Sequence, residues 1–149
     1  MSSRIYVLNG PNLDLLGERE PQIYGTQSLA DVEKLCLSVA QRYGAQLLFR
    51  QTNAEHEMIA WLHEARRAAG IVINPAGFAY HAVAVLDALR ACECPIIEVH
   101  ISNLYRREER WRQHSLSAAA ATGVITGLGI EGYRLALEYL LLRHTAARP

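Results

Sequence analysis

The chain has 149 residues, half of them hydrophobic, which suits a single domain spanning residues 1–149 with a full hydrophobic core. Its 15 basic and 15 acidic side chains cancel to a formal net charge of zero. A neutral chain has no global field that would attract nucleic acid or an anionic membrane, so any ligand must be recognised at a local site.

The first predicted strand, residues 5–8, runs into a segment with an unusual set of side chains. Residues 9–25 read N-G-P-N-L-D-L-L-G-E-R-E-P-Q-I-Y-G, with three glycines and two prolines, which predicts a tight turn followed by a loop. Arg19 and Tyr24 can meet across such a loop. A phenol, whose pKa is about 10, is a base at neutral pH only when a cation favours its anion, and Arg stays protonated. The alternative is a surface loop whose leucines pack down and whose charges are solvated.

Helices and strands alternate along the rest of the chain. Helices are expected at residues 28–44, about 53–69, 80–91 and from 131 onward, and further strands at 46–50, 71–73, 96–99 and 124–126. Ser28 followed by Asp31 predicts a capping box at the start of the first helix. Thr52 or Asn53 is expected to cap the second helix.

Five short and almost wholly apolar strands that alternate with helices indicate an α/β fold, in which helices cover both faces of a parallel sheet. Among doubly wound arrangements we expect the strand order 2-1-3-4-5. The switch point of that order lies between the first and third strands, and ligands should bind there, beyond the carboxyl ends of the strands.

Polar side chains gather at these strand ends. They are Asn9 and Asn12 after the first strand, Asn74 after the third, Glu98, His100, Ser102 and Asn103 in and after the fourth, and Arg107 and Arg112 in the next turn. Glu98 and His100 are two residues apart on a strand, so both face the same side. The carboxylate can orient the imidazole and favour the imidazolium, which makes His100 a candidate general acid. The alternative is an ordinary hydrogen-bonded pair that closes the sheet edge.

No metal or organic cofactor is indicated. The chain contains neither a G-x-x-x-x-G-K-[ST] loop nor a G-x-G-x-x-G motif. We interpret His56, His63 and His144 as surface residues rather than metal ligands. No leader segment or membrane-length apolar run is recognisable, and the three cysteines (Cys36, Cys92 and Cys94) form no even set and no C-x-x-C pair. We therefore expect reduced thiols and a cytoplasmic location.

Several motifs resemble the type II 3-dehydroquinate dehydratases over nearly the whole chain. In order they read L-N-G-P-N-L, R-E-P-Q-I-Y-G, E-V-H-I-S-N, W-R-Q-H-S and G-V-I-T-G-L-G-I-E-G-Y. The resemblance implies a flavodoxin-like fold and a lyase of the shikimate pathway. Such an enzyme converts 3-dehydroquinate to 3-dehydroshikimate by anti elimination of water through an enolate, without a cofactor. It also implies a homo-oligomer, a dodecamer built from trimers.

The same resemblance implies roles for the proton-transfer residues. Tyr24 would take the C2 proton, and Arg19, on a mobile lid, would favour the tyrosine anion. Asn12 would hold the water that stabilises the enolate oxygen. His100, oriented by Glu98, would protonate the departing C1 hydroxyl.

For substrate binding, the resemblance implies that the carboxylate is held by Asn74, Ile101 and Ser102, and that Asp87 reaches into a neighbouring subunit's site. Two departures concern the groups that bind the ring hydroxyls. The family's T-H-T-S is replaced by residues 79–82, A-Y-H-A, and a gapless count from Asp87 puts Tyr80 rather than His81 at the family's histidine. A turn that is one residue longer than the family's puts Arg112 at the family's hydroxyl-binding arginine.

Two other functions stay open at the level of the sequence. Because the hydroxyl-binding positions differ, one alternative is a dehydratase for a modified dehydroquinate, such as an amino analogue. The other is a non-catalytic paralogue that binds a small carboxylate. The retained Tyr24, Arg19 and His100 argue against the second, since binding alone needs no base.

Overall fold

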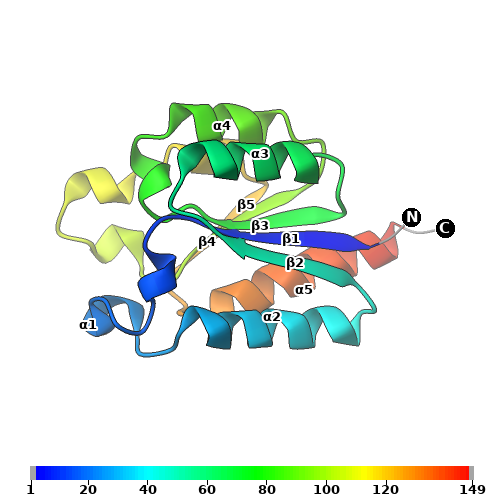
Figure 1. The fold of residues 1–149 in the computed structure, drawn as a ribbon, viewed down its shortest axis with the longest axis horizontal. Helices are drawn as coiled ribbons and strands as arrows, with labels where there is room; N and C mark the ends of the chain where they lie inside the picture. The colour runs from blue at the N-terminus through cyan, green and yellow to red at the C-terminus, as the bar shows by residue number, and fades with distance from the viewer. Residues whose placement is uncertain (1–2, 148–149) are drawn as a thin grey trace.

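The computed structural model of the chain describes residues 3–147. At its centre is a parallel five-stranded sheet in the order β2-β1-β3-β4-β5, which confirms the predicted order (Figure 1). The strands are β1 (Arg4–Asn9), β2 (Gln46–Gln51), β3 (Gly70–Asn74), β4 (Ile96–His100) and β5 (Gly123–Thr126). Each extends its predicted segment by at most one residue at either end.

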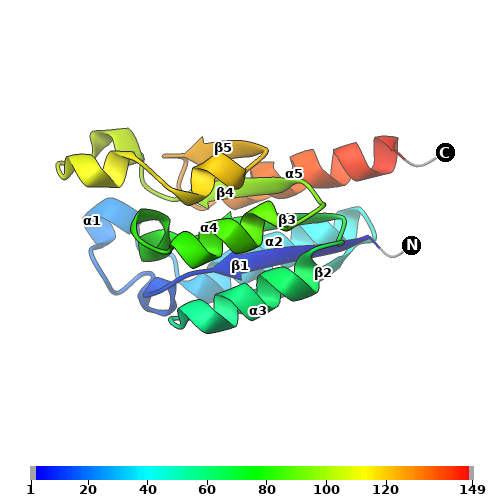
Figure 2. The same cartoon turned by 90° about the horizontal axis from the view of Figure 1, so that it is seen from above.

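Two long helices cover each face of the sheet, as Figures 1 and 2 show. Helices α2 (Leu29–Arg42) and α5 (Glu131–Ala146) lie on one face, and α3 (Glu55–Ala65) and α4 (Val83–Arg90) lie on the other. Because side chains alternate along a strand, β1 supplies both cores: Val7 packs with α2 and α5, and Leu8 packs with α3 and α4. Cys36 is fully buried in the first core, as its helical spacing predicted.

The helix boundaries agree with the sequence in one place and differ in two. Ser28 and Asp31 form the predicted capping box, with the Ser28 side chain and the Asp31 side chain each accepting the other's backbone N–H. The predicted cap of α3 is wrong, because Ala54 occupies the N-cap position and Thr52 instead accepts a hydrogen bond from the Ala54 N–H. The start of α4 is also wrong: Tyr80 ends a 3-10 turn, η2 (Ala76–Tyr80), and α4 begins three residues later.

Short helical segments after the strands build the rim of the molecule at the left of Figure 1. These are η1 (Leu13–Leu15) and α1 (Pro21–Tyr24) after β1, and η3 (Leu104–Arg106) and η4 (Arg110–Gln113) after β4. The next segment, η5 (Ser117–Ala120), packs against α4 instead. In the segment after β1, Leu13 and Leu16 are buried, whereas Leu15 is exposed. The loop is therefore fixed to the core at two points and still reaches outward.

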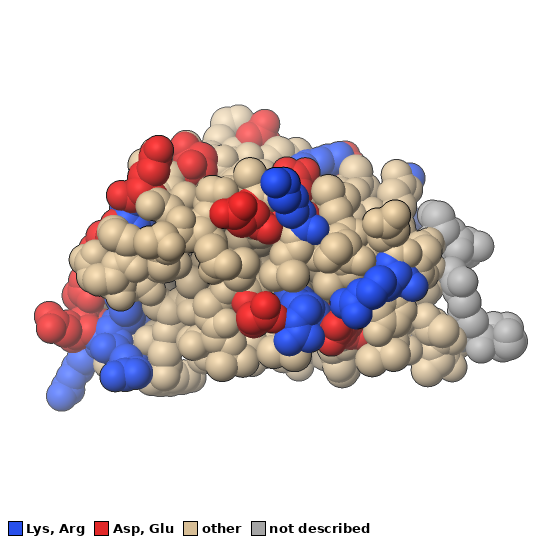
Figure 3. Space-filling view, turned by 90° about the horizontal axis from the view of Figure 1, so that it is seen from below, with Lys and Arg blue, Asp and Glu red and all other residues tan. Residues whose placement is uncertain are grey.

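The face covered by α2 and α5 carries charges of both signs (Figure 3). Arg42 of α2 and Glu138 of α5 pair across the two helices at 3.1 Å. Such exposed pairs add little stability, typically about 0–1 kcal/mol. Within residues 3–147, no helix is long and apolar enough to span a membrane.

Candidate active site

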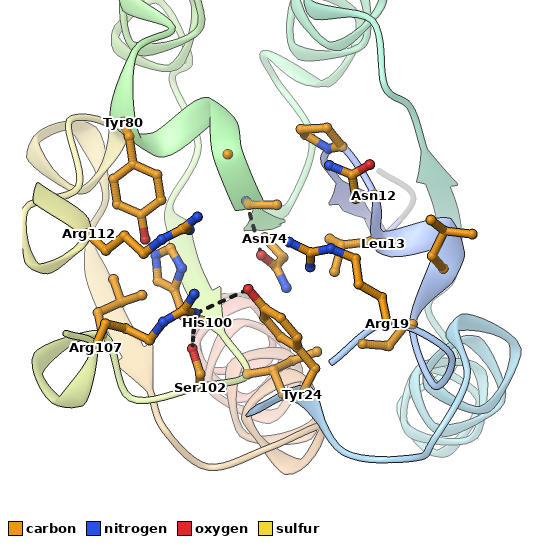
Figure 4. A pocket seen from close by; sticks show the side chains of 17 residues that line it. Asn12, Leu13, Arg19, Tyr24, Asn74, Tyr80, His100, Ser102, Arg107 and Arg112 are labelled. Carbon is orange, nitrogen blue, oxygen red and sulfur yellow. Dashed lines mark hydrogen bonds between the residues drawn. The ribbon is translucent and has the colours of Figure 1, made fainter. Parts of the chain in front are cut away.

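A pocket opens at the carboxyl ends of β1, β3 and β4, where the strand order predicted a site. Figure 4 shows side chains from four segments converging on it. The predicted site residues that line it are Asn12, Arg19, Tyr24, Asn74, Tyr80, His100, Ile101, Ser102 and Arg112. Arg107 lines it as well.

The backbones of β1 and β3 come close together at the base of this pocket. Asn9 of β1 is the register partner of Asn74 of β3, and the next amide, that of Gly10, donates to the Asn74 carbonyl over 2.8 Å. A Cβ atom on Gly10 would lie 2.3 Å from the Pro75 carbonyl oxygen, so this position requires glycine. The turn after β1 is thereby pressed against the turn after β3.

Tyr24 is held by two arginines that come from different ends of the pocket. Arg107 Nη1 donates to the Tyr24 hydroxyl over 3.1 Å, and the Arg19 guanidinium lies 5.1 Å from the centre of the Tyr24 ring. Burial alone would raise the pKa of Tyr24, but the hydrogen bonds and charges of Arg107 and Arg19 outweigh it and lower that pKa below its usual value. The arrangement favours a tyrosinate inside the pocket.

The role of Arg107 in the site could not be assigned from the sequence, which shows this residue only as one of the charges that follow the fourth strand. Arg107 also donates to Ser102 Oγ over 3.3 Å, so one guanidinium joins the tyrosine to the wall formed by β4 (Figure 4). Its place directly after a strand-end cluster was the signal that could have identified it.

Glu98 and His100 form the pair that their spacing predicted. His100 Nε2 lies 2.7 Å from Glu98 Oε2, and both side chains are buried, with Glu98 fully enclosed. Ser115 and Ser117 also donate to the carboxylate. Burial alone would raise the pKa of Glu98, but His100 and then the two serines lower it below its usual value. Glu98 lies behind His100 and does not itself line the pocket.

Asn74 is fixed by a buried network that includes a residue far along the chain. Tyr133 of α5 is fully buried; its hydroxyl donates to Asn9 Oδ1 over 2.7 Å and accepts from Asn74 Nδ2 over 2.9 Å. Asn74 Oδ1 accepts the Ala76 N–H. Since Nδ2 carries two hydrogens, one of them remains for a ligand. Tyr133 was not recognised from the sequence because it reads as part of the apolar face of the last helix.

Tyr80 and Arg112 form the opposite wall of the pocket. The Arg112 guanidinium lies 4.5 Å from the centre of the Trp111 ring and 5.6 Å from that of Tyr80. Arg112 Nε is 3.5 Å from Glu109 Oε1, but it is buried and makes no aligned hydrogen bond. Stacking therefore contributes more than hydrogen bonding to the orientation of this side chain.

Two predicted substrate-binding residues lie outside the pocket of their own chain. His81 is exposed, and its Nδ1 lies 3.0 Å from the Gly77 carbonyl oxygen. Asp87 is exposed on α4. Neither side chain lines the cavity.

Backbone strain is concentrated at the rim. Within residues 3–147, three non-glycine residues adopt left-handed backbone conformations: Asn12 (φ 68°), Glu20 (φ 43°) and Ala76 (φ 49°). Asn12 and Ala76 line the pocket, and Glu20 precedes the helix that carries Tyr24. Such conformations cost about 1–3 kcal/mol each and cluster at functional sites.

The described residues contain no group of three or more His, Cys, Asp or Glu side chains placed to hold a metal ion. The pocket is lined instead by amides, aromatic hydroxyls, an imidazole and three arginines. The arginines and amides of this set suit a small anionic ligand. The tyrosine hydroxyls and the imidazole can transfer protons.

Comparison with known proteins gives one consistent result. The family model described as dehydroquinase class II matches residues 3–141. A 3-dehydroquinate dehydratase 2 of Agrobacterium fabrum is 57% identical over 136 residues, which cover 91% of this chain and 92% of that protein. A 3-dehydroquinate dehydratase of Salinispora arenicola is 51% identical over 142 residues, which cover 95% of this chain and 99% of that protein.

The solved structures agree with the sequence comparisons. The crystal structure of a type II dehydroquinase from Propionibacterium acnes superposes with a TM-score of 0.90 at 46% identity, covering 95% of this chain and 98% of that one. The residues matched by the family model, 3–141, include all five strands and every segment that lines the pocket.

Proposed function

The chain belongs to the class II dehydroquinase family, and we propose that its pocket dehydrates 3-dehydroquinate with Tyr24 as the base and His100 as the acid. The activity is that of a hydro-lyase, which removes water from 3-dehydroquinate to give 3-dehydroshikimate. The observation that carries the assignment of residues is the contact of Arg107 with the Tyr24 hydroxyl inside the pocket.

In the first step, the Tyr24 anion takes the C2 proton beside the ketone of the substrate. Arg107 and Arg19 supply the positive charge that favours this anion. Arginine suits the task because it keeps its own proton at any working pH. The electrons of the broken C–H bond move onto the ketone oxygen, which becomes an enolate.

The enolate needs donors that are already in place when the negative charge develops. Asn12 lies on the strained turn after β1 and lines the pocket. We assign to it the water that donates to the enolate oxygen. A strained but fixed backbone keeps this amide from rearranging during the reaction.

In the second step, the enolate collapses and the C1 hydroxyl leaves. A hydroxyl is a poor leaving group unless it is protonated, and His100 is the proton donor in this proposal. The Glu98 carboxylate behind it, 2.7 Å from Nε2, orients the ring so that Nδ1 faces the pocket. The substrate carboxylate is assigned to the remaining Asn74 N–H and to Ile101 and Ser102, which line the pocket next to His100.

The other functions considered are less well supported. A protein that only bound a carboxylate would have no use for a tyrosine base held by two arginines. A dehydratase for a modified dehydroquinate is not favoured, since the relatives with about half of their residues identical are named for dehydroquinate itself.

We further propose a homo-oligomer, a dodecamer built from trimers, in which Asp87 contacts the neighbouring subunit's site. Support comes from the position of Asp87, exposed on α4 and outside its own pocket. We also propose a cytoplasmic location, which the three free thiols support. No cofactor is assigned, because the pocket supplies both the base and the acid from its own side chains.

The direct test is an ultraviolet assay that follows the conjugated enone product after addition of 3-dehydroquinate. We expect Tyr24→Phe to lose about 10²–10⁴-fold in kcat, the usual value of general base catalysis, while it keeps binding a carboxylate inhibitor. Tyr105→Phe, at an exposed tyrosine outside the pocket, is the matched control and should keep full activity. If Tyr24→Phe retained more than about a tenth of the activity, this base would be excluded.

A further inference from the structure

The buried Glu98 carboxylate accepts hydrogen bonds from two serines, Ser115 and Ser117, for which the reaction described above has no role. Ser115 Oγ donates to Glu98 Oε2 over 2.7 Å, and Ser117 Oγ makes a short hydrogen bond to Glu98 Oε1. The two serines follow Glu98 by 17 and 19 residues, belong to one segment and do not line the pocket. With His100 on Oε2, each carboxylate oxygen has at least one donor.

The positions of the hydroxyl hydrogens follow from counting donors. The two serine oxygens lie 3.0 Å apart, so one could in principle donate to the other. When Glu98 is ionised, each serine can direct its single hydrogen to the carboxylate, and with His100 this gives three hydrogen-bond partners for its two oxygens. Hydrogen bonds to a carboxylate favour its ionised form.

The serines also belong to the part of the chain that forms the wall of the pocket. Ser115 follows η4, which carries Arg112, and Ser117 begins η5. Between them, the Leu116 N–H donates to the Ala79 carbonyl over 2.7 Å, next to Tyr80. The segment that holds Glu98 is thus fixed to the wall that contacts the substrate.

We propose that Ser115 and Ser117 are positioning residues for the dehydration, which keep Glu98 ionised and aimed at His100 throughout the catalytic cycle. The proposal rests on the roles of Glu98 and His100 proposed above. In this proposal the segment from η4 to η5 does two things. Arg112 contacts the substrate, and the serines hold the carboxylate that orients His100.

The effect on pH dependence can be worked out from the groups around Glu98. On its own strand it faces His100, and from η2 it interacts electrostatically with Tyr80. Its register neighbours on β3 and β5 are apolar, Ile73 and Val124. Hydrogen bonds to a carboxylate favour its ionised form, so loss of a serine hydroxyl should raise the pKa of Glu98. Activity should then begin to fall at a higher pH as the solution is acidified.

The test compares Ser115→Ala, Ser117→Ala and the double variant with the wild-type enzyme, using kcat against pH. We expect kcat at neutral pH to fall about tenfold for each single variant, since hydrogen bonds to charged groups are the stronger kind. The acidic limb should move to higher pH, with little change in KM. Ser115→Thr and Ser117→Thr keep the hydroxyl and should restore both the rate and the limb. Ser38→Ala, at an exposed serine on α2 that bonds to its own helix, is the matched control.

A second readout does not depend on turnover. Infrared difference spectra during acid titration report the protonated carboxyl of Glu98, identified by its disappearance in Glu98→Gln. In the alanine variants this signal should appear at a higher pH. If Ser117→Ala fails to fold because it leaves a buried gap, the partly exposed Ser115 and the threonine variants still decide the question.

The outcomes separate this inference from the proposed function. Unchanged acidic limbs and carboxyl titrations in folded alanine variants would overturn the role of the serines. A uniform loss of rate at every pH that threonine does not restore would do the same. An active His100→Asn variant would instead overturn the role of His100 in the proposed function, whatever the serines do.

Discussion

Arg107 donates a hydrogen bond to the hydroxyl of Tyr24 over 3.1 Å, although the two residues lie 83 positions apart in the chain. The contact joins the short helix after β1 to the turn after β4, so it exists only in the folded protein. It also places a cation directly on the oxygen of the proposed base, and of the two arginines Arg107 does more to lower the pKa of Tyr24. Arg107 is therefore expected to set the ionisation of Tyr24 more strongly than Arg19 does.

The first prediction concerns the pH dependence of Arg107→Gln. The active form of the base is the tyrosinate, so kcat/KM rises as the pH passes upward through the pKa of Tyr24. Arg107 contributes to the lowering of this pKa, and its removal should move the rising limb to higher pH. We expect a loss of about 10- to 100-fold at neutral pH that partly recovers in alkaline buffer.

The neighbouring Arg106, which is exposed and does not line the pocket, provides the control. Arg106→Gln changes the net charge equally and should leave the pH profile unchanged. A profile of Arg107→Gln that is lowered at all pH values without a shift of the limb would contradict the electrostatic role.

The sequence predicted the strands and the strand-end cluster because both follow from local patterns, whereas the sheet order had to be chosen among known doubly wound arrangements. Apolar runs mark buried strands, and polar residues directly after them mark the carboxyl edge of a parallel sheet. The Glu98–His100 pair could likewise be predicted, since two residues on one strand face the same side.

What could not be predicted depends on contacts between distant segments. The Tyr133 hydroxyl, the two serines behind Glu98 and the Arg107–Tyr24 contact all join residues from different elements. The helix start at Tyr80 was predicted wrongly for a related reason. The Ala79 carbonyl accepts the Leu116 N–H, a long-range bond that no local pattern reports.

The second prediction concerns stability. Tyr133→Phe removes the hydroxyl that satisfies Asn9 and Asn74 in the buried network below the pocket. Leaving such buried groups without partners should lower the free energy of unfolding by about 1–3 kcal/mol. Chemical denaturation measures the change, and Tyr139→Phe, at an exposed tyrosine of the same helix, should be nearly neutral. Equal stability of both variants would show that water replaces the missing hydroxyl.

The third prediction concerns the loop that carries Arg19. Gly17 and Gly25, with φ values of 94° and 83°, flank Arg19 and Tyr24, and conformations of this kind can act as hinges. We expect Arg19→Lys to reduce kcat more than it raises KM, because an ammonium cannot reproduce the planar guanidinium beside the phenol.

If the loop closes over the substrate, a carboxylate inhibitor should slow proteolytic cleavage between Leu13 and Tyr24. The rate of cleavage is followed by mass spectrometry with and without saturating inhibitor. Equal rates in both samples would count against closure.

The fourth prediction concerns assembly. Asp87 is exposed and lies outside the pocket of its own chain, so a role in catalysis requires a second subunit. Light scattering should give the mass of a large homo-oligomer, and Asp87→Asn should reduce activity without changing stability. Glu93→Gln, at another exposed carboxylate, is the control and should leave the activity intact. A fully active monomer would refute the proposed assembly.

The last prediction concerns the two neighbouring candidates for contact with the ring hydroxyls, Tyr80 and His81. Tyr80 lines the pocket beside Arg112, whereas His81 is exposed and lies next to the Gly77 carbonyl. The tyrosine hydroxyl can both donate and accept, so it can pair with a substrate hydroxyl. We expect Tyr80→Phe to lower kcat/KM for 3-dehydroquinate by an amount equivalent to about 1–3 kcal/mol, because the substrate hydroxyl is then left without its partner. His81→Ala should be nearly silent. The two variants are matched in position and are measured in the same assay. A silent Tyr80→Phe together with a damaging His81→Ala would mean that the segment after β3 rearranges when substrate binds and that the histidine keeps the family's role.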